Sequence, residues 1–577
     1  MSNFDRILIY YKRYWVKLVL GCLCVLFTAI VGLLSPMIIR LTIDDLQLQI
    51  TQKKLITYGL LILGVATLRG LFLFSQRWIL VVMSRDVEND LRNDYYEHLQ
   101  KLPLDFFQQN RVGDLMARAT NDLNAVRMLV GPAIMYFLNT IVVSLVAIPV
   151  MITISLKLTI LVVISFLGVS IATNFFSTQI HDRFEKIQEH FSSITAKAQE
   201  NLTGIRVIRA YVRENYEIEK FSELNKEFVD RNLGLIKIQA MFSPILRSLV
   251  GLGSILTLWY GGNLVATKAI SLGKFVEFNL YLTLLIWPMI ALGYVVSLYQ
   301  RGMASLKRIN SILNTEVTIK DEKNIELANI KGAIEFRNLT FSYKDKPILK
   351  NINLKIEPGQ TVAIVGHTGS GKSTLINLIP RLFEAPKGTI FIDGYQIQDI
   401  PLPLLRQAIG YVPQDTFLFS ETITENIAFG VNKPNPKAVE KAAEQAGLLV
   451  DIESFPRQFD TLVGERGITL SGGQKQRTAI ARALIREPQI LILDDSLSAV
   501  DTETEERILG HLQTVMSGRT SIIVSHRIST VKMADLIIVL SDGEIIERGT
   551  HESLIAQGGN YAALYEKQLL EEELAAT

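Results

Sequence analysis

Cysteine is nearly absent from this chain of 577 residues, which holds two, Cys22 and Cys24. Because residues two apart on a helix point to different faces, the pair does not predict a disulfide framework. A strong excess of positive charge is also lacking: the net charge is +2, which argues against a nucleic-acid partner. The first apolar run is too long for a signal-peptide core and has no small-residue cleavage site, so we expect no cleaved signal.

Apolar residues, by contrast, are abundant. They make up 49% of the chain, and the mean hydropathy is +0.26, although 20% of the residues are charged. Most of the apolar excess lies in six stretches, each as long as the ~20 helical residues that cross a bilayer. These stretches are 16–39, 56–83, 128–151, 156–178, 241–265 and 275–299. The sequence therefore predicts an all-α transmembrane domain over residues 1–314.

Two long polar segments, 84–127 and 179–240, separate pairs of apolar stretches and are rich in arginine. Basic residues concentrate on the cytoplasmic side of membranes, so we expect both segments there. The N-terminus and everything after residue 300 then lie on the same side of a multi-pass protein of the cell (cytoplasmic, or inner) membrane. Residues 4–15 mix aromatic, aliphatic and basic side chains, which is typical of a helix in the membrane interface. An early start to the first span is the alternative.

The composition changes after the last apolar stretch. Residues 315–332 are polar and linker-like. Short β-rich runs follow, with helical stretches between them, and this alternation predicts an α/β domain over residues 333–577. The runs are 333–336, 361–365, 389–392, 490–493, 521–524 and 536–540.

One stretch of this second domain matches the P-loop pattern in full and lies between a predicted strand and a predicted helix. Glycines let backbone N–H groups turn toward phosphate oxygens, and the following helix adds its positive N-terminus. Lys372 should contact the β- and γ-phosphates of ATP, and the Ser373 hydroxyl should ligate Mg²⁺. The residues predicted to bind the nucleotide here are Gly366, His367, Thr368, Gly369, Ser370, Gly371, Lys372, Ser373 and Thr374.

Two carboxylates follow the apolar run 490–493. A carboxylate at the C-terminal end of such a strand faces the nucleotide crevice. Asp494 is therefore the candidate Mg²⁺ ligand, through a water, and Asp495 is placed near the attacking water.

A second motif, residues 470–474, gives the family resemblance. Together with the P-loop, it makes residues 333–560 resemble an ATP-binding-cassette nucleotide-binding domain. With six spans before it, the chain resembles a half-transporter of the multidrug-exporter group. In that family the motif caps the γ-phosphate held by the other domain's P-loop, so the resemblance implies a dimer with two sandwiched ATPs. The motif residues are Leu470, Ser471, Gly472, Gly473 and Gln474.

The resemblance also implies roles for further residues. Tyr343 matches the aromatic residue that stacks on adenine, with a half-buried strand aromatic as the alternative. Gln414 matches the glutamine that senses Mg²⁺ and the attacking water. His526 matches the histidine that hydrogen-bonds the γ-phosphate. Asp501 lies in a segment that matches the loop that crosses the dimer interface. Glu465 lies in a segment that matches the one in contact with the partner's intracellular loop.

Asp495 departs from the family pattern, which has Glu at this position as general base or water positioner. Aspartate is one methylene shorter, and a base displaced by about 1 Å can lose ~10²-fold in rate. We therefore expect the site on this P-loop to bind ATP but to hydrolyse it slowly. The hypothesis is a heterodimeric exporter of amphiphilic compounds (drugs, lipids or peptides) whose partner supplies Glu. A homodimeric exporter and a regulatory, channel-like subunit are the alternatives.

The charged residues that fall inside the apolar stretches include Arg69, Arg77, Arg247 and Glu277. Charge is expensive in a bilayer, so such residues are functional candidates. Snorkelling toward an interface and pairing between helices are the simpler interpretations.

Overall fold

The computed structural model describes residues 3–48, 50–321, 327, 329–343, 346–464, 467, 470–496, 510 and 513–576. The chain divides into two compact units. The first comprises Met1–Gln100 and Val112–Thr315, and the second comprises Lys101–Arg111 and Glu316–Thr577.

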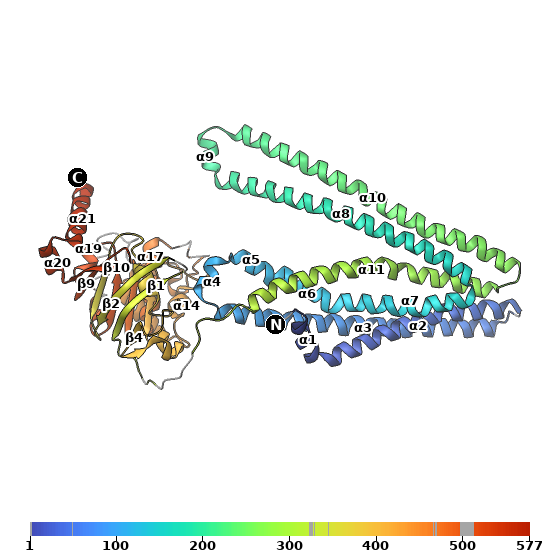
Figure 1. The fold of residues 1–577 in the computed structure, drawn as a ribbon, viewed down its shortest axis with the longest axis horizontal. Coiled ribbons are helices and arrows are strands. Elements are labelled where there is room, and N and C mark those ends of the chain that lie inside the picture. Colours follow the sequence, from blue (N-terminus) through green and yellow to red (C-terminus); the bar gives the residue numbers. More distant parts are fainter. Residues whose placement is uncertain are drawn as a thin grey trace. The chain divides into compact units, whose positions relative to one another are not determined.

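The first unit is built of long helices (Figure 1). Helix α1 (Asn3–Arg13) ends just before α2 begins, as expected for a separate N-terminal helix. Within the part of the chain that the structure describes, six helical stretches are long and apolar enough to cross a membrane, and each contains one of the stretches predicted from the sequence. The prediction of a six-helix membrane domain is thus confirmed. The stretches are α2 (Trp15–Leu48), α3 (Gln52–Lys101), Val112–Ile154, α8 (Leu156–Thr203), α10 (Glu214–Ala266) and α11 (Leu272–Leu313).

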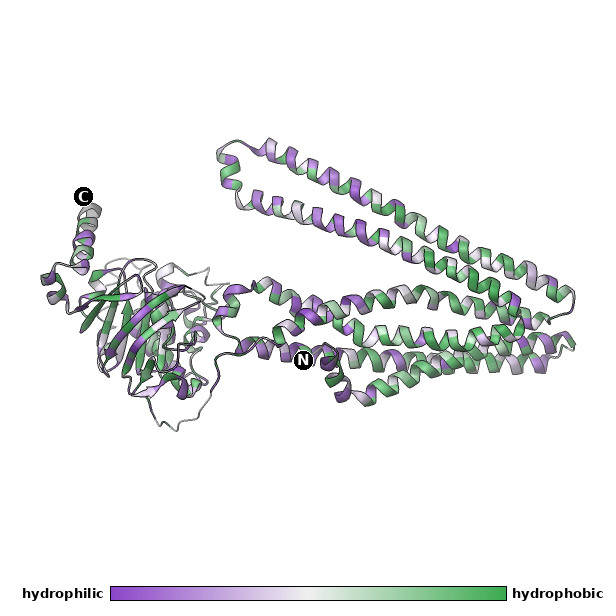
Figure 2. Ribbon diagram, viewed as in Figure 1, coloured by the Kyte–Doolittle hydropathy of each residue, from purple (hydrophilic) through white to green (hydrophobic). Residues whose placement is uncertain are grey.

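The third stretch is not a uniform α-helix. It comprises α5 (Val112–Ala117), α6 (Leu123–Met128) and α7 (Ile134–Ile154), joined by the π-helical turns Arg118–Asp122 and Leu129–Ala133. Helix α11 packs along α7, α2 and α6, whereas α8 packs mainly on α10. A short helix, α9 (Ile205–Ala210), joins α8 to α10 (Figure 1). Polar residues dominate α8 and α10 toward α9 and apolar residues dominate the opposite half (Figure 2).

Polar contacts fix α2 against α11 at one end of the first unit. Arg40 Nη1 lies 3.1 Å from Oε2 of Glu277, whose side chain is 1% exposed. Asp44 accepts hydrogen bonds from the Ser271 hydroxyl and the Gly273 amide. A Cβ at position 273 would lie 2.5 Å from Asp44 Oδ1, so this position requires glycine. The charge predicted in the sixth stretch is therefore paired between helices.

The second unit is an α/β domain, as predicted. Its six-stranded sheet has the order β10-β9-β3-β8-β7-β6, parallel except for β10, and a four-stranded antiparallel sheet has the order β2-β1-β4-β5. The strands are β1 (Ile334–Ser342), β2 (Pro347–Ile356), β3 (Thr361–Val365), β4 (Ile390–Ile392), β5 (Tyr395–Gln396), β6 (Ile409–Val412), β7 (Ile490–Asp494), β8 (Thr520–Val524), β9 (Leu536–Ser541) and β10 (Glu544–Gly549).

Helices pack around these sheets. They are α12 (Lys372–Asn377), α13 (Leu402–Gln407), α14 (Ile423–Ala428), α15 (Pro436–Gln445), α16 (Leu449–Ser454), α17 (Gly472–Leu484), α19 (Ile528–Val531), α20 (His551–Gln557) and α21 (Asn560–Ala576). Strands β2, β5, β6 and β10 are not among the runs predicted from the sequence. Strand β2 alternates buried and exposed residues, so its pattern could have revealed it.

The beginning of the segment expected to be a linker packs on the second unit. The carbonyl of Lys320 accepts a hydrogen bond from Arg381, and Asp321 Oδ1 accepts one from the Leu402 amide at the start of α13. The same compact unit includes the short helix α4 (Leu104–Gln109).

Candidate functional site

The P-loop joins β3, the third strand of the six-stranded sheet, to α12. Gly366 has φ 151°, and a Cβ there would lie 2.1 Å from the carbonyl oxygen of Leu540. Gly369 and Gly371 have φ of 83° and 102°, which non-glycine residues adopt with difficulty. The glycine pattern thus shapes a loop whose exposed residues, 367–369, lie above a buried strand.

Three side chains converge beneath this loop. The buried Lys372 donates from Nζ to the carbonyls of Gly366, at 2.8 Å, and His367, at 3.0 Å. Ser373 donates from Oγ to Oδ1 of Asp494, at 3.2 Å. Burial lowers the pKa of Lys372 and raises that of Asp494. The site thus combines a buried cation with a hydroxyl and carboxylate directed at each other.

Asp495 follows at the carboxyl end of β7. Its backbone adopts φ 45°, and its amide donates to the carbonyl of Val524 at 2.8 Å. This hydrogen bond ties the residue to the end of β8. The charge of Asp495 acts on Lys372, Asp494 and His526, which places the four groups in one region.

His526 and Gln414 occupy the ends of neighbouring strands. His526 follows β8, and its pKa is lowered by burial of part of the ring and by the charge of Lys372. Gln414 follows β6, the neighbour of β7, and is exposed. The parallel sheet therefore gathers the ends of β3, β6, β7 and β8 at one edge, where α/β proteins bind ligands.

Tyr343 follows β1 and belongs to the four-stranded side of the unit. Its hydroxyl donates to Oγ1 of Thr374 in α12 at 3.2 Å. Its ring centroid lies 4.8 Å from that of Phe383 and 5.3 Å from that of Phe341, edge to face in both cases. The ring is half-buried beside the P-loop helix, so the structure brings the predicted adenine residue to the phosphate cradle.

The motif 470–474 begins α17. Ser471 caps the helix: its Oγ accepts from the amide of Gln474, and its own amide donates to Gln474 Oε1 at 3.0 Å. Ser471 and Gly472 are exposed, whereas Leu470 is buried. Leu470 packs in a hydrophobic cluster with α14, α15 and α17, distinct from the cluster that holds α12. The exposed helix N-terminus therefore belongs to a different part of the unit from the phosphate cradle.

Asp451, in α16, is a site residue that the sequence analysis missed. Its Oδ1 accepts from Gln474 Nε2 at 3.0 Å, and its Oδ2 accepts from Arg477 at 2.8 Å. An acidic residue 23 positions before Gln474 gives no local signal, so only the packing of α16 on the start of α17 reveals it. Two predicted residues, Asp501 and Glu465, lie outside the described residues.

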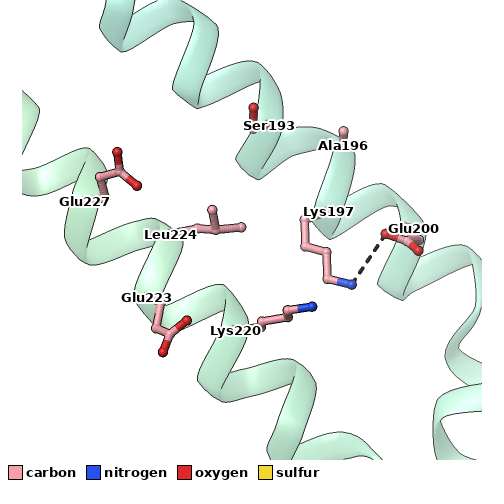
Figure 3. Close-up of a pocket in the computed structure, with 8 residues that line it drawn as sticks. All are labelled: Ser193, Ala196, Lys197, Glu200, Lys220, Glu223, Leu224 and Glu227. Atoms are coloured by element: carbon pink, nitrogen blue, oxygen red, sulfur yellow. Dashed lines mark hydrogen bonds and ion pairs between the residues drawn. The ribbon is translucent and has the colours of Figure 1, made fainter.

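A hollow of about 770 Å³ lies between the polar halves of α8 and α10 (Figure 3). Lys197 extends across it and pairs with Glu200 and, at 2.7 Å, with Glu217. The close approach of Glu217 is the main cause of the raised pKa of Lys197. Because this cation already has carboxylate partners on both helices, the hollow is better explained as an ion-pair network than as a binding site.

Fold and site together define a multi-pass membrane protein with a P-loop nucleotide-binding unit. The family "ABC transporter transmembrane region" matches residues 18–289, and the family "ABC transporter" matches residues 349–498. The chain belongs to the ABC transporter family, and is an ATPase coupled to membrane transport.

Individual relatives span the whole chain. It is 38% identical to the probable multidrug resistance ABC transporter ATP-binding/permease protein YheI of Bacillus subtilis (strain 168), over 97% of both chains. It is 34% identical to the ATP-dependent lipid A-core flippase of Syntrophus aciditrophicus (strain SB), over 100% of this chain and 96% of the flippase. The solved structure of a bacterial Atm1-family ABC exporter with ATP bound matches with a TM-score of 0.78 and 27% identity, over 96% of this chain and 99% of that one.

Proposed function

We propose that this chain is one half of an ATP-driven exporter of amphiphilic compounds in the cytoplasmic membrane. The arginine-rich segments between the spans support a cytoplasmic position for the N-terminus and the nucleotide-binding unit. The relatives named for multidrug resistance and for lipid A-core transport support amphiphilic substrates.

The described residues fit ATP with Mg²⁺. Lys372 is positioned to exchange its two carbonyl contacts for phosphate oxygens. The Ser373 hydroxyl and the Asp494 carboxylate would hold Mg²⁺, which usually takes one or two protein oxygens besides phosphate and water. When bound, this ion would neutralise charge on the phosphates. Tyr343 would stack on adenine, while His526 and Gln414 would face the γ-phosphate and the attacking water.

The motif at α17 would serve a second nucleotide. Ser471 and Gly472 present an exposed helix N-terminus, where anions bind favourably. Because Leu470 packs in a core separate from that of α12, we place this N-terminus against the nucleotide of a partner chain. Each ATP would then lie between one chain's P-loop and the other chain's motif.

The proposal that this chain's own site hydrolyses ATP slowly rests on Asp495. Its backbone is anchored to Val524, so the shorter side chain cannot simply move forward to replace a glutamate. A base must lie within about 3 Å of the proton that it accepts. We infer that a partner with Glu at this position provides the fast site, completed by Ser471–Gln474 of this chain.

ATP turnover of the purified chain in lipid nanodiscs tests the proposal. The chain alone should turn over slowly, and Asp495→Glu should raise the rate about tenfold or more, since it restores the reach of the base. Asp542→Glu is the matched control, because Asp542 has a similar φ, 46°, in the turn between β9 and β10. Its rate should match that of the unmodified chain.

Other outcomes would contradict the proposal and support a different assembly or activity. Ordinary turnover by the chain alone, abolished by Asp495→Asn, would establish a working homodimer. Vesicles containing both subunits should move a lipophilic dye on addition of ATP; an ATP-gated ion conductance without dye movement would establish a channel-like subunit instead.

A further inference from the structure

Helix α12, which carries Lys372 and Ser373 in its first turn, is only six residues long. Helices shorter than about 12 residues are marginal in water, so their direction depends on contacts with the rest of the fold. The direction of α12 in turn decides where its lysine and serine meet the phosphates and Mg²⁺. The contacts that hold this helix are therefore part of the nucleotide site.

Two tyrosine hydroxyls hold the same face of α12. Thr374 and Asn377 are three residues apart, which makes them neighbours on the helix surface. Tyr343 donates to Thr374 at 3.2 Å, and Tyr411 donates to Oδ1 of Asn377 at 2.7 Å. The first tyrosine follows β1 of the four-stranded sheet, whereas the second lies in β6 of the six-stranded sheet. The helix is thus joined to both sheets through one face.

Tyr411 lies close to the catalytic edge of its sheet. It is three residues before Gln414, and it pairs with Ile492 of β7, two residues before Asp494. Its half-buried ring packs, with Ile492, in the hydrophobic cluster that holds α12. Burial and the charge of Asp494 raise the pKa of the Tyr411 hydroxyl, so the group stays protonated and can donate. One hydrogen bond therefore joins α12 to the strand that leads to Gln414.

A separate contact holds the turn that follows α12. Arg406 of α13 donates from Nε to the carbonyl of Pro380 at 3.0 Å and from Nη2 to the carbonyl of Arg381 at 2.8 Å. These hydrogen bonds fix the backbone after the helix, whereas Tyr411 contacts a side chain of the helix itself. Loss of the Tyr411 hydroxyl should therefore shift α12 without detaching it from the unit.

We propose that Tyr411 is a positioning residue of the ATPase reaction: through Asn377, it sets the distance between the phosphate-binding start of α12 and Gln414. A displacement near 1 Å between reacting groups can cost ~10²-fold in rate, so a bond that fixes this distance should affect hydrolysis more than binding. This inference rests on the proposed function, in which Gln414 faces the attacking water, and adds to it a residue that acts through Gln414.

Single-turnover hydrolysis by the full chain in lipid nanodiscs tests this role. With the chain in excess over γ-labelled ATP and Mg²⁺ present, even slow cleavage can be followed to completion, and the Kd for a fluorescent ATP analogue is measured on the same samples. Tyr411→Phe should lower the rate about three- to tenfold, the effect of one neutral hydrogen bond, and leave the Kd unchanged. Asn377→Leu should act alike. Tyr395→Phe, at an exposed position of β5, is the matched control and should change neither quantity.

The double variant Tyr411→Phe with Asn377→Leu separates positioning from stability. A single change leaves the other polar group unpaired, whereas replacing both partners by apolar groups can be nearly neutral for stability. The double variant should therefore regain the Tm that the single variants lose, yet hydrolyse ATP as slowly as either of them. A rate that recovers together with the Tm would show that the hydrogen bond only stabilises the fold.

Gln414→Ala tests whether Tyr411 acts through Gln414. This variant should hydrolyse ATP slowly, and adding Tyr411→Phe should slow it no further, because both changes disturb one interaction. An unchanged rate in Gln414→Ala, or a further loss in the combined variant, would overturn the inference.

Dye movement into vesicles distinguishes this role from export. If the Tyr411 variants behave as expected but ATP moves no dye, the positioning role stands and the proposed export function is wrong. If ATP moves dye while Tyr411→Phe hydrolyses ATP as fast as the unmodified chain, the export function stands and the positioning role is wrong.

Discussion

Gln474 donates a hydrogen bond from Nε2 to Oδ1 of Asp451 at 3.0 Å, while its Oε1 accepts from the amide of Ser471 at 3.0 Å. One side chain thus links α16 to the N-terminus of α17. Because the amide group of Gln474 is planar, fixing its nitrogen also fixes the oxygen that closes the helix cap.

The first prediction concerns Asp451. Asp451→Ala should leave nucleotide binding to this chain's P-loop unchanged but lower ATP turnover of the assembled transporter about tenfold, the effect of losing one or two hydrogen bonds to a charged group. Asp451→Asn should retain more activity, because its oxygen can still accept from Gln474. Turnover and the Kd for a fluorescent ATP analogue separate the two effects. Glu453→Ala, at an exposed position of the same helix, is the control; an equal loss there would contradict a role for Asp451.

The second prediction concerns Tyr343. Tyr343→Ala should weaken ATP binding by about 1–3 kcal/mol, the range for loss of one base–aromatic stack. Tyr343→Phe keeps the ring and loses the hydrogen bond to Thr374, so it should bind nearly as well. Since stacking tolerates any base, the free energy of GTP binding should weaken by a similar amount. Calorimetric titration of both nucleotides measures this, and an unchanged Kd in Tyr343→Ala would show that the ring is a structural part of the Phe341–Phe383 cluster.

The third prediction is a pH dependence. Burial and the charge of Lys372 hold the pKa of His526 below its ordinary value of 6.5 in the folded protein. The unfolded chain therefore binds the proton more readily, and the free energy of unfolding should fall as the pH drops below 6.5.

Thermal melting of the nucleotide-free chain in detergent, from pH 5.5 to 7.5, follows this effect. His526→Gln should reduce the slope of Tm against pH. His181→Gln is a control elsewhere in the chain and should leave the slope as it is. Identical slopes in His526→Gln and the unmodified chain would refute the assignment.

The fourth prediction concerns the Arg40–Glu277 pair. Removing one partner of a buried ion pair typically costs about 3–5 kcal/mol, because the other charge stays buried alone. Arg40→Met should therefore lower the Tm of the chain, because it leaves the buried Glu277 without its partner, and the double variant Arg40→Met with Glu277→Leu should recover part of the loss. Lys54→Met breaks a more exposed pair and should change stability by less than about 1 kcal/mol. Additive effects of the Arg40 and Glu277 changes would show that the two residues do not interact.

The sequence by itself determined the class of protein. Six apolar stretches and the glycine pattern 366–371 are local signals: a membrane span needs only length and hydropathy, and a P-loop needs glycines where φ is positive. The position of Asp494 after an apolar strand was also sufficient to place it beneath the loop, because parallel strands end at one edge.

The tertiary structure decided which distant residues meet. Asp451 is 23 positions from Gln474, and Arg40 is 237 positions from Glu277, so no periodicity or motif joins them. Charge in a span was visible in the sequence for both Glu277 and Arg69. Packing then gave Glu277 a partner on α2 and placed the Arg69 guanidinium against Gly32 of α2, because pairing and solvation depend on which helices become neighbours.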